Sequence, residues 1–201
     1  MINAVIFDLW STLGGKHTSI SRSTFKKFRI PMNRKNSVRY ERSVQLKKWK
    51  TMDQMAISFL KEFNLSISQR TVAIVKKAFQ HAIRNATPFP GIKTLLGRLH
   101  RHYKLALLSN TTCFESEVPN RWGFDGLFDV EVYSWKIGSI KPCRRNFQIS
   151  AKRLGVKMEE CLFVDDNIIN VLAAKRFGMK AIQFQNVGQL KRELHALNIK
   201  F

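Results

Sequence analysis

The sequence predicts an α/β protein with a doubly wound, mostly parallel sheet and a helical cap domain. From residue 90 onward, short apolar runs alternate with amphipathic stretches of helical period, which is typical of a parallel sheet covered by helices on both faces. Residues 15–87 contain helical stretches but no strand pattern, so they are expected to be an insertion after the first strand. We therefore expect a core formed by residues 1–14 and 88–201 and a cap formed by residues 15–87.

The core elements follow from their patterns in chain order. The apolar run at 4–7 is a buried strand, and residues 91–102 place apolar side chains at helical spacing before a second strand at 103–110. Further strands are expected at 128–134, 161–166 and 180–184, and further helices at 114–121, 144–154, 167–178 and 187–197. Gly155 and Gly178 suit the C-termini of two of these helices.

Charge separates the two regions. The chain has 35 Lys and Arg against 14 Asp and Glu, and residues 15–87 hold 17 of these basic residues but only 3 of the acidic ones. Between residues 16 and 50, Glu41 is the single acid among twelve basic residues. A cap of this charge attracts polyanions, so we expect small phosphorylated substrates or nucleic acid as partners.

The cap is expected to contain helices at 37–50, 52–63 and 68–86. Aromatic residues stand among its charges: Phe25, Phe28, Tyr40 and Trp49. They are either stacking platforms for bases or the apolar faces of the cap helices, and we expect the second.

Several classes of protein are excluded. The three cysteines lack CxxC spacing, which argues against a disulfide framework and a zinc site. No apolar run reaches the ~18 residues of a membrane span, and the N-terminus lacks the features of a signal peptide. We expect a cytoplasmic protein without a membrane partner, and we predict no oligomeric state.

Polar residues follow the carboxyl ends of three predicted strands. They are Asp8, Ser109, Asn110, Asp165 and Asp166. Lys141, in the stretch GSIKP, precedes the helix at 144–154. Taken alone, an Asp, Asn or Ser at the end of a strand is commonly only a helix cap or a turn residue. Here, however, the carboxyl ends of parallel strands bring these residues together at one edge of the sheet. Crowded carboxylates need a cation, and a cation beside Lys and Ser can bind phosphate, so the combination predicts a functional site.

These stretches resemble the motifs of the haloacid dehalogenase superfamily. VIFDLWST, LLSN, GSIKP and FVDDNIIN resemble its four motifs in order, and TPFPGIKTLLGRLHRHYKLALLSNTT is similar to the segment that leads from cap to core. The resemblance spans nearly the whole chain. It implies a Rossmann-like core and a hydrolase that uses a nucleophilic aspartate.

The resemblance also implies a role for each residue. Asp8 matches the nucleophile that forms an aspartyl-phosphate, Ser109 and the backbone near Asn110 match the phosphate-binding groups, and Lys141 matches the charge-neutralising lysine. The implied Mg²⁺ ligands are Asp8, the backbone carbonyl of Trp10, Asp165 acting through water and Asp166 acting directly. Asn170 falls where many members have a polar residue that supports the metal ligands.

Trp10 departs from the family pattern. Phosphatases of this family have a second Asp two residues after the nucleophile, which protonates the leaving group and activates water. Trp10 offers only its carbonyl, so an acid–base contribution of typically ~100- to 10,000-fold must come from another group. His17, close to the nucleophile loop, is our hypothesis for that group.

Three classes of function remain open. The first is a magnesium-dependent phosphatase that is slow on poor leaving groups. The second is a protein of the same fold that has lost catalysis and binds a phosphorylated or nucleic-acid partner through its cap. The third is a dehalogenase, because dehalogenases also have an aromatic residue two positions after the nucleophile. Asp165 and Asp166 favour the first, since displacement of halide needs no divalent ion.

Overall fold

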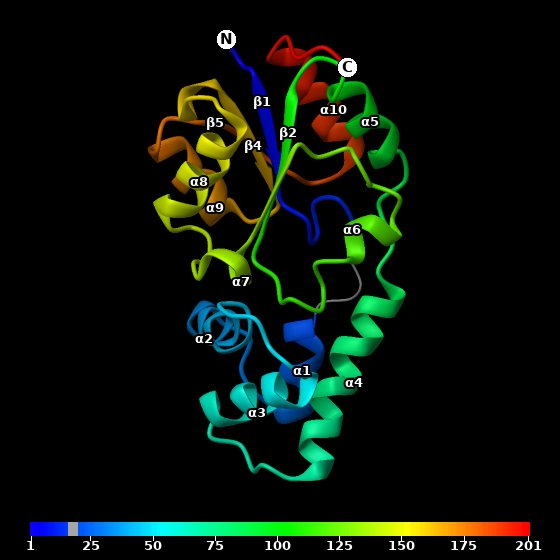
Figure 1. The fold of residues 1–201 in the computed structure, drawn as a ribbon, viewed down its shortest axis with the longest axis vertical. Coiled ribbons are helices and arrows are strands. Elements are labelled where there is room, and N and C mark those ends of the chain that lie inside the picture. The colour runs from blue at the N-terminus through cyan, green and yellow to red at the C-terminus, as the bar shows by residue number, and fades with distance from the viewer. Residues whose placement is uncertain (16–19) are drawn as a thin grey trace.

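A single sheet of five parallel strands forms the centre of the computed structural model, which describes residues 1–15 and 20–201. The strand order is β3-β2-β1-β4-β5 (Figure 1). The strands are β1 (Ala4–Phe7), β2 (Lys104–Ser109), β3 (Val130–Tyr133), β4 (Cys161–Asp165) and β5 (Lys180–Gln183). In the centre, Ile6 pairs with Ala106 on one side and with Phe163 on the other. The predicted α/β class with a Rossmann-like parallel sheet is confirmed.

Helices cover both faces of the sheet. α5 (Ile92–Leu99) and α10 (Val187–Ala196) pack on one face, in a cluster that includes Val5 and Phe7. α8 (Arg144–Leu154) and α9 (Ile168–Arg176) pack on the other face, over Ala4 and Ile6 (Figure 1). Because successive strand residues point to opposite faces, a central strand covered on both sides must be apolar throughout, as β1 is.

The connecting segments contain short helices. They are α6 (Val118–Arg121), α7 (Ser134–Ile137) and the 3₁₀ turn η1 (Met158–Glu160). The helix predicted at 114–121 is thus shorter than expected, and α7 was not predicted. The helix predicted at 144–154 is confirmed, and Gly155 follows it with a positive φ of 69°.

Four helices form a second body, which we call the helical lobe (residues 20–85). They are α1 (Ile20–Phe28), α2 (Arg34–Val44), α3 (Met52–Glu62) and α4 (Gln69–Asn85). The lobe has its own apolar cluster, in which the Phe25, Tyr40 and Phe59 rings lie edge to face. Phe25, Tyr40 and Trp49 are buried there, and the partly buried Phe28 packs against them. These aromatic residues are therefore core residues of the lobe.

The helix predicted at 37–50 is corrected to α2 at both ends. The helix begins earlier because the side chain of Asn33 accepts a hydrogen bond from the backbone N–H of Asn36. It ends at Val44, whose carbonyl accepts a hydrogen bond of 2.8 Å from the indole N–H of Trp49. The chain folds back there instead of continuing as a helix. α1 was not predicted.

The lobe joins the core where two segments pair. Gly14 bridges Pro88, Gly15 N donates to Thr87 O at 2.9 Å, and Phe89 N donates to Leu13 O at 2.9 Å. A Cβ on Gly14 would lie 2.4 Å from Thr87 O, so only glycine fits at this crossing. The domain division at residues 15–87 stays a prediction. No helix in the described part of the chain is long and apolar enough to cross a membrane.

Candidate active site

The predicted site residues meet at one edge of the sheet. Asp8 directly follows β1, Ser109 ends β2 and Asp165 ends β4, and these strands are parallel neighbours. Lys141, just before α8, brings its Nζ to 2.6 Å from Asp8 Oδ1 and 2.7 Å from Asp165 Oδ2. The strand ends and the loop before α8 thus build one cluster from residues far apart in the sequence.

Lys141 is buried and all three of its ammonium donors are used. The third hydrogen bond, of 2.9 Å, goes to the carbonyl of Leu108. Burial lowers the pKa of Lys141, but the charges and hydrogen bonds of Asp165 and Asp8 outweigh it and raise the pKa above its ordinary value. Lys141 is therefore a fixed positive charge.

The positive charge of Lys141 only partly compensates the cost of burying a negative charge on Asp8. Burial raises its pKa to about 8, with Lys141 opposing the rise and Asp165 and Asp166 adding to it. Its second oxygen, Oδ2, accepts a hydrogen bond of 3.2 Å from Thr12 Oγ1. A divalent cation at this position would favour the ionised, nucleophilic form of Asp8.

Three carboxylates can hold such a cation. Asp8, Asp165 and Asp166 each offer an oxygen, and these atoms lie within 4.8 Å of one another. The partly exposed Asp166 has a pKa raised to about 6 by burial and by Asp165, with Lys141 opposing. Mg²⁺ prefers oxygen ligands of this kind, so the donor set fits the predicted metal.

Neighbouring side chains fix these carboxylates. Asp165 Oδ1 accepts from the backbone N–H of Asn167 at 2.8 Å, and its Oδ2 accepts from Asn170 Nδ2 at 3.0 Å. Thr12 Oγ1, which donates to Asp8, also accepts from the backbone N–H of Asp166 at 3.1 Å. Thr12 therefore connects two of the three possible metal ligands.

Ser109 and Asn110 lie beside Lys141. Ser109 Oγ is buried and has no hydrogen-bond partner among residues 1–15 and 20–201, so a ligand oxygen would satisfy it. The side-chain oxygen of Asn110 accepts from the backbone N–H of Lys141 at 2.8 Å. This hydrogen bond fixes the loop that carries the lysine.

Trp10 fills the position where the resemblance implies an acid. Its indole Nε1 donates to Thr111 Oγ1 at 3.3 Å, and its ring meets Trp122 edge to face with centroids 6.0 Å apart. An indole has no proton to exchange at neutral pH, so the side chain of Trp10 lines the site but cannot act as an acid.

Glu41 lies at the site although it was not predicted there. It projects from α2, and its Oε2 accepts from Asn110 Nδ2 at 3.3 Å. Glu41 and Trp10 line one cavity of about 180 Å³. A single acid in a strongly basic segment was the only sequence signal for it. His17, the predicted substitute acid, lies outside the described residues.

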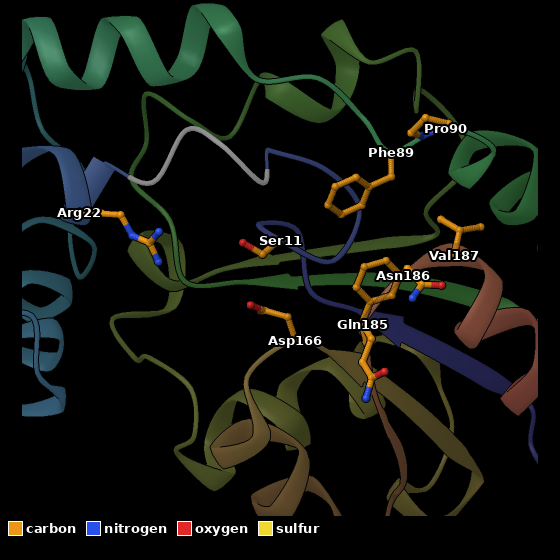
Figure 2. A pocket seen from close by; sticks show the side chains of 9 residues that line it. Ser11, Arg22, Phe89, Pro90, Asp166, Gln185, Asn186 and Val187 are labelled. Carbon is orange, nitrogen blue, oxygen red and sulfur yellow. The ribbon is translucent and has the colours of Figure 1, made fainter.

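A second, larger cavity of about 840 Å³ opens on the metal-ligand side (Figure 2). Figure 2 shows Ser11 and Asp166 at its centre, with Arg22 of α1 on one side and Gln185 on the other. Phe89 lines the wall away from Arg22 (Figure 2), and its ring stacks on that of Phe184, another lining residue, with centroids 5.6 Å apart. This cavity can hold a molecule much larger than phosphate.

The family follows from comparison with known proteins. The profile of the haloacid dehalogenase-like hydrolases matches residues 2–178, and the chain belongs to this family. A bifunctional riboflavin kinase/FMN phosphatase of Arabidopsis thaliana is 34% identical over 113 residues, 52% of this chain and 29% of the relative. The chain spans less than half the length of the first curated relatives that it matches.

Solved structures show the same fold at lower identity. A haloacid dehalogenase family enzyme of Bacteroides thetaiotaomicron, in complex with magnesium and inorganic phosphate, has a TM-score of 0.65 and 18% identity over 94% of this chain and 99% of its own. The L-2-haloacid dehalogenase of Xanthobacter autotrophicus, with chloropropionic acid covalently bound, has a TM-score of 0.62 and 22% identity over 100% of this chain and 85% of its own. At these identities the likeness concerns the fold, so the activity must be argued from the site.

Proposed function

We propose that this hydrolase is a magnesium-dependent phosphatase that forms an aspartyl-phosphate on Asp8. The observation that carries the proposal is the position of Lys141, whose Nζ contacts both Asp8 and Asp165 inside a cluster of three carboxylates. A nucleophile, a fixed cation and a set of oxygen ligands for a metal are the components that phosphoryl transfer needs. The phosphatase activity in the name of the Arabidopsis relative supports it.

The reaction would begin when an oxygen of Asp8 attacks phosphorus and the bond from phosphorus to the leaving oxygen breaks. Lys141, the Ser109 hydroxyl and backbone N–H groups near Asn110 would hold the phosphoryl oxygens. Water then hydrolyses the aspartyl-phosphate and restores Asp8. Magnesium, when bound by Asp8, Asp165, Asp166 and the carbonyl of Trp10, would supply positive charge to the phosphoryl group.

The carboxylate cluster distinguishes this proposal from dehalogenation. Displacement of halide from carbon needs no divalent ion, so Asp165 and Asp166 would then hold no metal. The dehalogenase likeness extends to the fold, at 22% identity. We therefore place phosphoryl transfer first.

The test is phosphate release from a panel of aryl and alkyl phosphomonoesters, with magnesium or with EDTA, by the wild-type protein and Asp8→Asn. Release that requires both magnesium and Asp8 would support the proposal. Release that is equal in Asp8→Asn would refute it, and so would halide release from 2-haloacids in EDTA. No turnover, together with salt-sensitive binding of RNA or DNA, would favour the binding-only alternative.

A further inference from the structure

We infer that Glu41 is the general acid and base of the proposed phosphatase reaction, acting from the helical lobe where Trp10 cannot act from the core. The inference rests on the proposed function. It extends that function by assigning the proton transfers to a side chain outside the four motifs.

The position of Glu41 is fixed by contacts between the lobe and the core. The C-terminal end of α2 packs on the core, where the Gln45 carbonyl lies 2.8 Å from Ser134 Oγ. Within that helix, Glu41 Oε2 meets the side-chain amide of Asn110. The same Asn110 side chain accepts from the backbone N–H of Lys141, so one residue separates Glu41 from the lysine that contacts the nucleophile.

The charge around Glu41 sets it apart from the other acids of the lobe. Glu62 pairs with Arg39 at 2.8 Å and Asp53 pairs with Lys76 at 2.7 Å. Glu41 has no ion pair with any residue of the described ranges, although basic residues surround it in the sequence. Within the described residues, the side-chain hydrogen bond of Glu41 is thus with Asn110 of the site and not with a cation of the lobe.

The environment also suits proton transfer. Burial raises the pKa of Glu41 to about 7, opposed by the charge of Lys141 and the Asn110 hydrogen bond and reinforced by Asp165. The other titratable groups at this cavity are Tyr40 and Glu115, whose pKa values are also raised by burial. A carboxyl group that exchanges its proton near neutral pH can act both as an acid and as a base.

Other described groups in the cluster are not available for this role. Lys141 keeps its proton between two carboxylates, and Asp165 is already held by Lys141 and Asn170. Asp8 is the nucleophile in the proposed reaction, and Trp10 has no exchangeable proton. Glu41 is the remaining carboxyl group that approaches the phosphate-binding residues from the lobe.

The direction of attack brings the leaving group toward the lobe. In an in-line displacement the leaving oxygen lies on the side of phosphorus opposite the attacking oxygen. Asp8 attacks from the end of β1, and the helical lobe lies beyond the carboxyl ends of the strands (Figure 1). The leaving oxygen therefore faces the element that carries Glu41. The cavity shared with Trp10 also has room for the water of the second step.

Both steps balance with Glu41 as the proton carrier. In the first, Asp8 bonds to phosphorus, the ester P–O bond breaks, and the Glu41 carboxyl group gives its proton to the leaving oxygen to form an alcohol. In the second, Glu41 takes a proton from water while the water oxygen bonds to phosphorus and the bond to Asp8 breaks. Phosphate leaves, and Asp8 and Glu41 return to their initial states.

The experiment compares the wild-type protein, Glu41→Gln and Glu62→Gln on phosphomonoesters whose leaving groups range from nitrophenol to an alkyl alcohol. We expect Glu41→Gln to lower kcat/KM about 100-fold or more for the alkyl ester and less than about 10-fold for the nitrophenyl ester, because only the poor leaving group needs a proton. Nitrophenol should appear as a burst followed by slow turnover, since water activation is also lost. Glu62→Gln, which changes an acid on the same lobe, should match the wild type.

Equal losses on all leaving groups, or no loss while release still requires Asp8, would overturn the inference. A selective loss in His17→Gln in place of Glu41→Gln would also overturn it. If Glu41→Gln does not fold, Glu41→Asp keeps the acid and should change the pH profile on the alkyl ester; an unchanged profile contradicts the role. The proposed function fails differently, since release would then not depend on Asp8 in any variant.

Discussion

The ammonium group of Lys141 lies 2.6 Å from Oδ1 of Asp8, and both side chains are buried. Burying an isolated charge costs free energy. The same ammonium group also contacts a second buried carboxylate, that of Asp165. The three groups are therefore energetically dependent on one another. Removing one of them changes the charge balance of the other two.

Replacing Lys141 with Met would test this dependence. The variant leaves two buried carboxylates without their cation, so we expect the free energy of unfolding in EDTA to fall by about 3–5 kcal/mol. Phosphate release should fall at least about 100-fold. Urea denaturation and the phosphate assay measure the two effects. Lys76→Met, which removes the partly exposed ion pair with Asp53, should cost less than about 1 kcal/mol. Similar losses in both variants would contradict the prediction.

Thr12→Val should weaken metal binding. The hydroxyl of Thr12 donates to Asp8 and accepts from the backbone N–H of Asp166, so its loss frees two of the proposed metal ligands to move. We expect a 10- to 100-fold weaker magnesium affinity, in the range found for groups that orient metal ligands. Titration calorimetry with Mg²⁺ alone measures it. Thr24→Val removes a buried hydroxyl that bonds to Ile20 O in the lobe, and it should leave magnesium affinity unchanged.

The pKa of Glu41 predicts a pH dependence of stability. Burial raises this pKa from 4.5 to about 7, so the folded protein holds the proton more tightly than the unfolded chain does. The resulting stabilisation is fully present below pH 4.5 and is lost as the pH rises to 7. Glu41→Gln lacks it, so its stability relative to the wild type should rise by about 3 kcal/mol from pH 4.5 to pH 8, because one pKa unit corresponds to about 1.4 kcal/mol. Denaturation at both pH values, in EDTA, measures this, and a constant difference would contradict it.

Gly14→Ala should destabilise the junction between core and lobe. The added Cβ would meet the backbone oxygen of Thr87 at 2.4 Å and the Trp122 ring at 2.6 Å, so backbone must move. We expect a loss of about 1–3 kcal/mol in the free energy of unfolding. Gly97→Ala is the matched control, because an added Cβ there would meet nothing within 4 Å apart from its chain neighbours and the backbone of its own helix, α5. It should gain about 0.5–1 kcal/mol.

The parallel core could be predicted because its strands are continuous apolar runs that end in polar residues. Asp8, Ser109 and Asp165 meet for the same reason, since neighbouring parallel strands place their carboxyl ends together. α1 was missed because few of its positions are buried: only Ile20, Thr24 and Phe25 face the interior of the lobe. Its nine residues include only three apolar ones, Ile20, Phe25 and Phe28, which are too few to mark a helix within a charged segment.

The place of Glu41 at the site could not be predicted from the sequence. The contact of Glu41 with Asn110 joins residues 69 positions apart, and it depends on how the lobe packs against the core. No local pattern encodes that packing. The buried aromatic rings of the lobe, by contrast, follow the helical period, which favoured a core role over base stacking.

The pairing of Leu13 with Phe89 has a consequence for how such a protein can diversify. The segment that leaves the core and the segment that returns to it are joined by hydrogen bonds, so the ends of the inserted helical region lie side by side. We therefore expect that other helices inserted between Leu13 and Phe89 would leave the path of the sheet and the three carboxylates unchanged. In the proposed reaction, the group that would protonate a substrate could then change independently of the group that would attack it.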